Sequence, residues 1–324
     1  MNTSRIKTVL LWVNSNRLSL YLLILFTTAG LLFIPNVFSN QYNGFDIGLT
    51  PLIPASEIQH GGPPRDGIPS IDKPIFIPAI TADYLHTTDR IIGLVANNTA
   101  KAYPVRILNW HEIVNDGDLV ISYCPLCGTG MAYESPDANF GVSGLLYNSD
   151  MLLFDRETES LWSQIMAKAI SGKRKGESLS ILVVENTSWE DWLNKHPDTL
   201  VLSEETGFSR NYSVSPYGNY SVSKALYFPV NKQSRRFHPK EKVIGIEING
   251  LSKVYAFSEL SKSKSSFIQD RIGKLNIEVH FNPLHRTAHI RTSKEQVMLP
   301  SLTSYWFAWF AFHPASEIYI FKKQ

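Results

Sequence analysis

The sequence predicts an α+β protein of two related, diverged β-rich halves with short helices, which follow an N-terminal transmembrane helix. Three observations support this class: strand-like runs separated by turn residues, pairs of similar stretches in one order, and a long apolar segment near the start. A hydrophobic content of 44% and a charged content of 19% indicate a packed globular body rather than a disordered chain.

The apolar segment, residues 18–35, has no charged residue and follows a basic flank that ends at Arg17. Its length is close to the lower limit for crossing a bilayer, and the basic flank places the N-terminus in the cytoplasm. We therefore expect residues 1–17 in the cytoplasm and a single-pass anchor in the inner membrane, with the body on the periplasmic side. Cleavage after Ser39, which would give a secreted protein, and a buried core helix are the alternatives.

Residues 36–72 are rich in Pro, Gly and Asn, which is typical of a tether leading into a folded body. We assign residues 73–235 to the first half and residues 236–324 to the second. The net charge is +2 with no long basic run, so the sequence shows no electrostatic sign of nucleic-acid binding.

The first half begins with a predicted β-hairpin over residues 90–108, in which two apolar runs flank an Asn97-Asn98 turn. A short helix is expected over residues 109–117, because Gly117 is a typical stop signal. The strand-like run 119–121 then leads into the cysteines.

Similar stretches recur in the same order and predict an internal duplication, with chance similarity as the alternative. In the pair 189–197 and 306–314, the expected helix ends at His-Pro in both copies, because proline disfavours helix in the preceding residue. The first copy also carries an insertion, which includes residues 140–150 and 154–162. The matched stretches are 91–94 with 243–246, 101–104 with 253–256, 124–129 with 282–287, and 189–197 with 306–314.

Cys124 and Cys127 are the only cysteines, and they form a C-x-x-C turn that contains Pro125 and ends at Gly128. Two thiolates at this spacing can hold one metal ion, and copper or zinc is the expected cofactor. A redox pair is the competing hypothesis, although no βαβ unit surrounds the motif. A structural pair without chemistry is the third.

His111 and His285 are the candidates to complete the metal site. His285 occupies the position of Cys127 in the second copy, so packing of the two halves about a pseudo-twofold axis would bring it toward the thiols. His111 lies shortly before the cysteine strand, and Met131 is a further candidate. For each of these three residues, a place in the core or at a helix cap is the alternative.

Four residues of the insertion are the candidates for catalysis by carboxylates: Asp150, Asp155, Arg156 and Glu159. Paired carboxylates can perform acid–base chemistry, but a solvated or salt-bridged loop has the same composition. No nucleophile elbow, zinc-protease helix, phosphate-binding loop or dinucleotide-binding loop motif is present in the sequence.

Several longer stretches match a known family. They are Asp66–Pro69, Ala102–Pro104, Ile107–Asp116, Tyr123–Gly128, Gly141–Asp150, Asp155–Trp162 and His196–Thr199. On these motifs the chain resembles the bacterial "domain of unknown function 3179" family over residues 61–321. The resemblance implies an exported or membrane-anchored protein and adds weight to Cys124, Cys127 and His111 as site residues, without supplying a metal or a reaction.

The sequence thus predicts an exported, membrane-anchored protein that binds copper or zinc through its Cys-Pro-Leu-Cys turn. The alternatives are a thiol-based oxidoreductase or a carboxylate-dependent hydrolase of the cell envelope, and a structural or interaction module without catalysis. Whether the protein is an enzyme stays open at this point.

Overall fold

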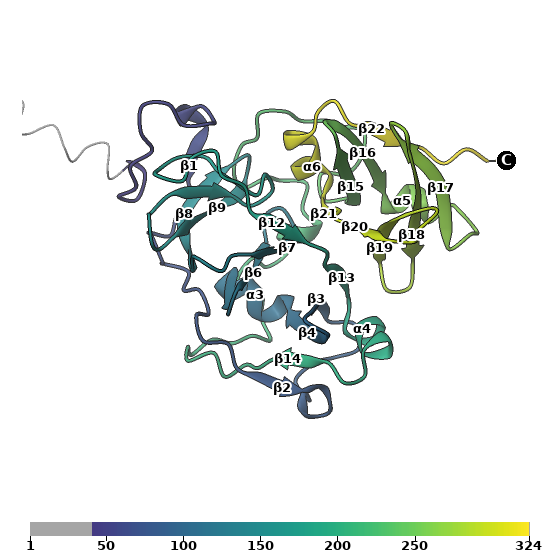
Figure 1. Ribbon diagram of the computed structural model, residues 1–324, viewed down its shortest axis with the longest axis horizontal. Coiled ribbons are helices and arrows are strands. Elements are labelled where there is room, and N and C mark those ends of the chain that lie inside the picture. The colour runs from purple at the N-terminus through teal and green to yellow at the C-terminus, as the bar shows by residue number, and fades with distance from the viewer. Residues whose placement is uncertain (1–40, 324) are drawn as a thin grey trace, which may run out of the picture.

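The computed structural model describes residues 41–323, and these residues are mostly in β-sheets. Five separate sheets of four or five strands are arranged as a five-bladed β-propeller (Figure 1). The α+β prediction is therefore wrong, because the helices of the described chain are short and lie between strands. No helix within residues 41–323 is long and apolar enough to cross a membrane, and the anchor predicted at residues 18–35 lies outside the described part.

We label the sheets A to E. In strand order, sheet A contains β1 (Ile58–His60), β8 (Phe140–Tyr147), β9 (Asp150–Asp155), β10 (Leu161–Ser163) and β11 (Lys168–Ala169). Sheet B contains β12 (Ser180–Leu182), β7 (Thr129–Glu134), β6 (Leu119–Cys124) and β5 (Ile113–Asp116). Sheet C contains β13 (Glu185–Ser188), β3 (Arg90–Ala96), β4 (Thr99–Pro104), β14 (Leu200–Leu202) and β2 (Phe76–Pro78). Sheet D contains β21 (Leu302–Tyr305), β15 (Lys242–Ile248), β16 (Leu251–Ala256) and β22 (Glu317–Tyr319). Sheet E contains β17 (Phe267–Ile272), β18 (Leu275–Asn282), β19 (Thr287–Thr292) and β20 (Met298–Leu299).

The helices connect strands. The α-helices are α3 (Val105–His111), α4 (Trp189–Lys195), α5 (Phe257–Leu260) and α6 (Trp306–Phe312). The 3-10 helices are η1 (Ala55–Glu57), η2 (Ala79–Thr81) and η3 (Tyr220–Val222). The helix expected at residues 109–117 is only partly correct, because Ile113 and Val114 are buried in β5, where they pair with β6.

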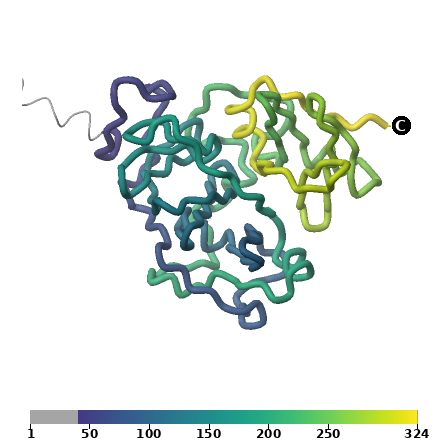
Figure 2. Tube along the Cα trace, viewed as in Figure 1, coloured from purple at the N-terminus to yellow at the C-terminus, as the bar shows by residue number. Residues whose placement is uncertain are grey.

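Sheets C and D repeat one topology, and the sequence echoes fall on equivalent strands. In each sheet a hairpin (β3–β4 or β15–β16) receives an antiparallel strand on one side and a parallel strand on the other. A partly buried polar contact repeats as well. Lys101 and Tyr103 both bond Asp116 in the first copy, and Lys253 and Tyr255 both bond Asp270 in the second. In Figure 2 the second copy, green to yellow, lies beside the first.

A tryptophan packs on a glycine at the same place in both copies. Trp192 of α4 covers Gly93, and Trp309 of α6 covers Gly245. A Cβ added at either glycine would lie 2.3 Å from the ring. The indole nitrogens are fixed by hydrogen bonds of 2.9 Å to Thr199 and to Ser316 Oγ, so the rings have little freedom to move.

We expect Gly93→Ala and Gly245→Ala each to lower the free energy of unfolding by about 1–3 kcal/mol, because overpacking a fixed ring forces side chains out of their rotamers. Urea denaturation measures the change. Thr99→Ala, at an exposed position of β4, is the control and should change stability by less than about 0.5 kcal/mol. A glycine variant no less stable than this control would contradict the packing.

A long irregular segment covers one side of the first copy. Residues 203–241 join β14 to β15 and contain only η3 as regular structure. We call this segment the covering loop. Its Tyr220 belongs to the buried cluster that contains the two cysteines, and its Phe228 packs against the same cluster. Structureless segments of this length in a folded protein are often functional, so the cysteine region beneath it is the first place to look for a site.

Candidate functional site: a buried cluster of two thiols and a carboxyl

The β6–β7 hairpin positions both cysteines. Cys124 is the last residue of β6 and pairs with Thr129 of β7, and Cys127 lies in the loop between them. The second copy clamps this loop: Tyr305 N donates to Cys127 O at 2.8 Å, and Lys242 Nζ donates to Gly128 O at 2.8 Å. Gly128 has a φ of +60°, and a Cβ there would lie 2.8 Å from the Tyr305 ring. The loop is therefore held in one conformation.

A second hairpin brings in a carboxyl group. The turn between β8 and β9 has Asn148 and Ser149 at φ values of 52° and 62°, which is the left-handed pair that a tight two-residue hairpin requires. Asp150 follows directly as the first residue of β9. The turn therefore aims Asp150 and the Ser149 carbonyl toward the β6–β7 hairpin of sheet B.

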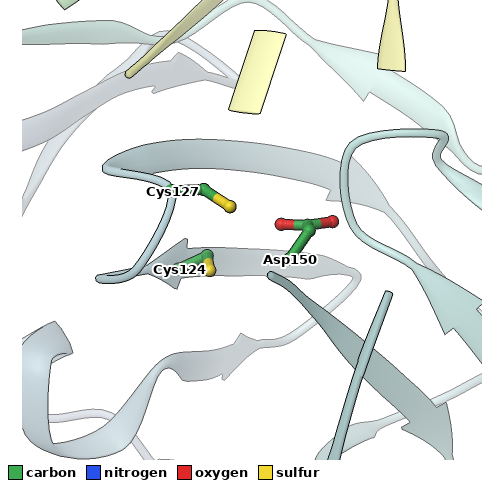
Figure 3. Close-up of side chains that lie close together, drawn as sticks. All are labelled: Cys124, Cys127 and Asp150. Atoms are coloured by element: carbon green, nitrogen blue, oxygen red, sulfur yellow. The ribbon is translucent and has the colours of Figure 1, made fainter. Parts of the chain in front are cut away.

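The thiols and the carboxyl converge (Figure 3). One ligand atom from each of Cys124, Cys127 and Asp150 lies within 4.8 Å of the others. The exposed fractions are 1% for Cys124 and 0% for Cys127 and Asp150, and both cysteines are free thiols. Both Sγ atoms contact the Ser149 carbonyl oxygen, at 3.8 and 3.3 Å.

The Asp150 carboxyl is only half satisfied. Oδ2 accepts a hydrogen bond from Ile165 N at 3.1 Å, whereas Oδ1 is buried without a partner among residues 41–323. Asp155, at the other end of β9, shows how a buried carboxyl is normally held. It accepts from Thr158 N at 2.6 Å and from Trp162 Nε1 at 2.8 Å. A buried oxygen without a partner costs free energy, and here this oxygen lies beside two thiols.

Burial favours the protonated forms of all three groups. It raises the pKa of Asp150 from its ordinary 3.8 to about 7, because the charged carboxylate loses its water. Burial also raises the pKa of the Cys124 thiol, and it raises that of Cys127 well above the ordinary value. A positive ion among the three groups would reverse these shifts and draw the protons away.

A second buried carboxyl lies close to the thiols. Glu112, directly after α3, has a positive φ of 60°, which is unusual for this residue type. Its side chain accepts a hydrogen bond from Tyr217 OH of the covering loop at 2.7 Å, and burial raises its pKa to about 7. The charge of Glu112 raises the pKa of Cys124, so the two carboxyl groups act on this thiol in the same direction.

The structure places the other predicted metal ligands in separate contacts. His111 is bonded through Nδ1 to Pro69 O at 2.8 Å and through Nε2 to Tyr212 OH at 2.7 Å. His285 is bonded through Nδ1 to Ser188 Oγ at 2.8 Å. The Met131 sulfur accepts from Tyr133 OH at 3.3 Å. Within the described chain, the group of His, Cys, Asp and Glu residues suited to hold a metal ion includes neither His111 nor His285.

The four residues of the insertion that were candidates for catalysis do not gather at one point. Asp150 and Asp155 are the two ends of β9, about 16 Å apart at roughly 3.3 Å per strand residue. Arg156 pairs with Asp66 at 2.9 Å, and Glu159 pairs with Arg65 at 2.7 Å. Of the four, only Asp150 lies beside the thiols.

Sequence reasoning missed the pairing of Asp150 with the cysteines, and it missed Glu112 and Lys242. The sequence indicates only an acid–base role for Asp150. Glu112 lies in the matched stretch Ile107–Asp116 without a chemical signature of its own, and Lys242 lies outside the matched stretches. The available signal was that the Tyr123–Gly128 and Gly141–Asp150 stretches both belong to the matched family motifs, without any indication that they meet.

The fold and the site together define a β-propeller protein with a buried pair of thiols and a carboxyl at the junction of two sheets. The chain belongs to the family described as "Protein of unknown function (DUF3179)", whose family model matches residues 65–316. The family resemblance inferred from the sequence motifs is thereby confirmed. Comparison with curated proteins and with solved structures finds no match.

Proposed function

We propose that Cys124, Cys127 and Asp150 bind one zinc ion through two thiolates and one carboxylate oxygen. The observation that carries this proposal is Asp150 Oδ1, which is buried without a partner in residues 41–323 and lies beside two free thiols. A metal ion would satisfy this oxygen and both sulfurs at once.

The donor set favours zinc over copper. Thiolates suit both zinc and copper(I), whereas a carboxylate oxygen is a common ligand of zinc and a poor one for the softer copper(I) ion. Three protein ligands also leave one position of a tetrahedral zinc ion for water or another molecule.

The surroundings can offset the negative charge of such a site. Burial lowers the pKa of Lys240 to about 8 and that of Lys242 to about 7, and the charge of Cys127 opposes both shifts, so the two side chains lie within electrostatic reach of the thiolate. Lys242 also holds the cysteine loop through Gly128 O. In their protonated forms the two lysines would stabilise the ionised sulfurs that zinc requires.

A thiol redox centre is the second candidate, and the closeness of the two sulfurs favours it. Against it, burial raises the pKa of both thiols, whereas exchange chemistry needs a thiolate that is formed easily and is accessible.

The proposed setting is the periplasmic side of the inner membrane, with residues 18–35 as the anchor. In that oxidising compartment two neighbouring thiols form a disulfide readily unless a metal ion holds them. A C-terminal fusion to a reporter that is active only in the periplasm tests this location. An inactive periplasmic reporter, together with activity of a reporter that folds only in the cytoplasm, would contradict it.

Metal analysis of the full-length protein, purified in detergent without an affinity tag, tests the zinc proposal. We expect about one zinc per chain in the wild type and none in the Cys124→Ser/Cys127→Ser variant, because the hydroxyl replacements cannot supply thiolate ligands. Equal zinc content in the two proteins would contradict the proposal. Oxidised thiols without zinc in the wild type would favour the redox candidate.

His285→Gln is the matched control. His285 is bonded to Ser188 and lies outside the Cys124–Cys127–Asp150 cluster, so this variant should keep its zinc. Loss of zinc from His285→Gln would indicate that metal binding depends on packing between the two copies rather than on the three proposed ligands.

A further inference from the structure

A pocket beside the cysteine hairpin is lined by residues of both copies. Its volume is about 470 Å³, and Tyr123 and Pro125 of the cysteine hairpin form part of its wall. This volume is within the range of small-molecule sites, roughly 300–1,000 Å³, and exceeds the needs of a single bare ion.

The wall of this pocket is strongly positive. Four cationic side chains line it: Arg90, Lys240, Lys242 and Arg286. No Asp or Glu is among the lining residues, and none of the four cations forms an ion pair with a carboxylate anywhere in the described chain. Like charges gathered without a carboxylate repel one another, so a bound anion would stabilise the arrangement.

Backbone oxygens hold Arg90, Lys240 and Lys242 in place. Arg90 donates to His285 O at 2.5 Å and to Asn186 O at 2.6 Å, and Lys240 Nζ donates to Ala225 O at 2.8 Å. Carbonyl dipoles orient the side chains but leave their net charge uncompensated. Burial and the charges of Arg90 and Arg286 lower the pKa of Lys242 to about 7, which is the penalty expected of a crowded cationic site.

The rest of the wall is aromatic. Tyr123, Tyr217, Tyr220 and Tyr305 line the pocket, and two of the rings lie against the lysines. Lys240 Nζ is 3.7 Å from the centre of the Tyr220 ring, and Lys242 Nζ is 4.6 Å from that of Tyr305. Tyrosine rings provide flat apolar surface next to the charges, which suits a ligand that carries a planar group as well as an anionic one.

We infer that this pocket binds a small organic molecule with a phosphate group, held by Arg90, Lys240, Lys242 and Arg286. Arg90, Arg286 and Lys240 are joined by Lys242, which a bound anion would keep protonated, and this set of cationic groups favours a dianion over a monocarboxylate. The tyrosine rings accommodate the organic portion. The proposal does not depend on zinc, because none of the four cations is a proposed metal ligand.

Isothermal titration calorimetry of the full-length protein in low-salt, phosphate-free buffer at pH 7 tests the inference. The probes are phenyl phosphate, inorganic phosphate and benzoate. We expect phenyl phosphate to bind most tightly and benzoate most weakly. Arg286→Gln should weaken phenyl phosphate binding about tenfold or more, because it removes one charged contact from an exposed side chain without changing the core.

Arg271→Gln is the matched control, since Arg271 is also exposed and its loss changes the net charge equally. We expect it to leave binding unchanged. The inference is overturned if phenyl phosphate does not bind, if benzoate binds as tightly, or if the two arginine variants have equal affinities.

Discussion

Replacing Asp150 with Asn will stabilise the metal-free protein above pH 7 and abolish zinc binding. Burial raises the pKa of the folded carboxyl to about 7, whereas in the unfolded chain it titrates near its ordinary 3.8. Because the folded value is the higher one, the contribution of Asp150 to stability is complete below about pH 4 and is lost as the pH rises to about 7. This shift corresponds to a loss of about 4 kcal/mol, which the neutral amide avoids.

Urea denaturation of the zinc-free proteins at pH 4 and pH 8 measures this effect. The gain from Asp150→Asn should be present at pH 8 and largely absent at pH 4. Zinc added at pH 8 should stabilise the wild type and leave the variant unchanged, because a ligand that binds only the folded state shifts the equilibrium by mass action.

Asp155→Asn is the control for this experiment, since Asp155 is equally buried but fully hydrogen-bonded. Its replacement should destabilise the protein by about 1–3 kcal/mol at both pH values and leave zinc binding intact. If Asp150→Asn behaves like Asp155→Asn, the Asp150 carboxyl is a structural group and the zinc site is wrong.

The affinity for zinc will fall steeply as the medium is acidified. In the zinc-free protein both thiols are protonated at neutral pH, and Asp150 is half protonated at about pH 7. Zinc must displace these protons. Below the pKa of a ligand group, each proton displaced from it lowers the affinity for zinc about tenfold per pH unit. We expect the dissociation constant to rise roughly 100- to 1,000-fold between pH 7 and pH 6.

Competition with a chromophoric chelator of known proton dependence measures this slope, and calorimetry in buffers of different ionisation enthalpy counts the released protons. We expect about two to three released protons per zinc, because two ligands are protonated thiols and the third is a carboxyl that is half protonated near pH 7. A dissociation constant that does not change with pH would exclude the thiols as ligands.

The sequence predicted local features of the fold well and the assembly poorly. The Asn97-Asn98 turn and the two His-Pro helix ends are set by neighbouring residues, and the structure has all three. Sheet A was not recognised, because β1 from the expected tether pairs with β8 of the insertion, as in Ile58 with Tyr147. Such long-range pairing leaves no periodic signal in either segment.

The candidate site divides in the same way. A C-x-x-C motif is local and can be recognised without a structure, so the sequence identifies Cys124 and Cys127. Asp150 reaches them from a hairpin of another sheet, and the missing partner of its Oδ1 is visible only in the folded protein.

His285 shows how the repeat misled the prediction. It occupies the position equivalent to Cys127, but each of the two equivalent loops packs on the opposite copy. The loop with Cys127 contacts Lys242 and Tyr305, and the loop with His285 contacts Arg90 and Ser188. His285 therefore contacts Ser188 of the other copy and is not part of the group formed by Cys124, Cys127 and Asp150.

X-ray absorption spectroscopy at the zinc edge of the purified full-length protein tests the central claim most directly. The account predicts two sulfur neighbours at ~2.3 Å together with oxygen at ~2.0–2.2 Å, and loss of the sulfur shell in Cys124→Ser/Cys127→Ser. Zinc surrounded only by nitrogen and oxygen, or a spectrum identical in the double variant, would contradict it.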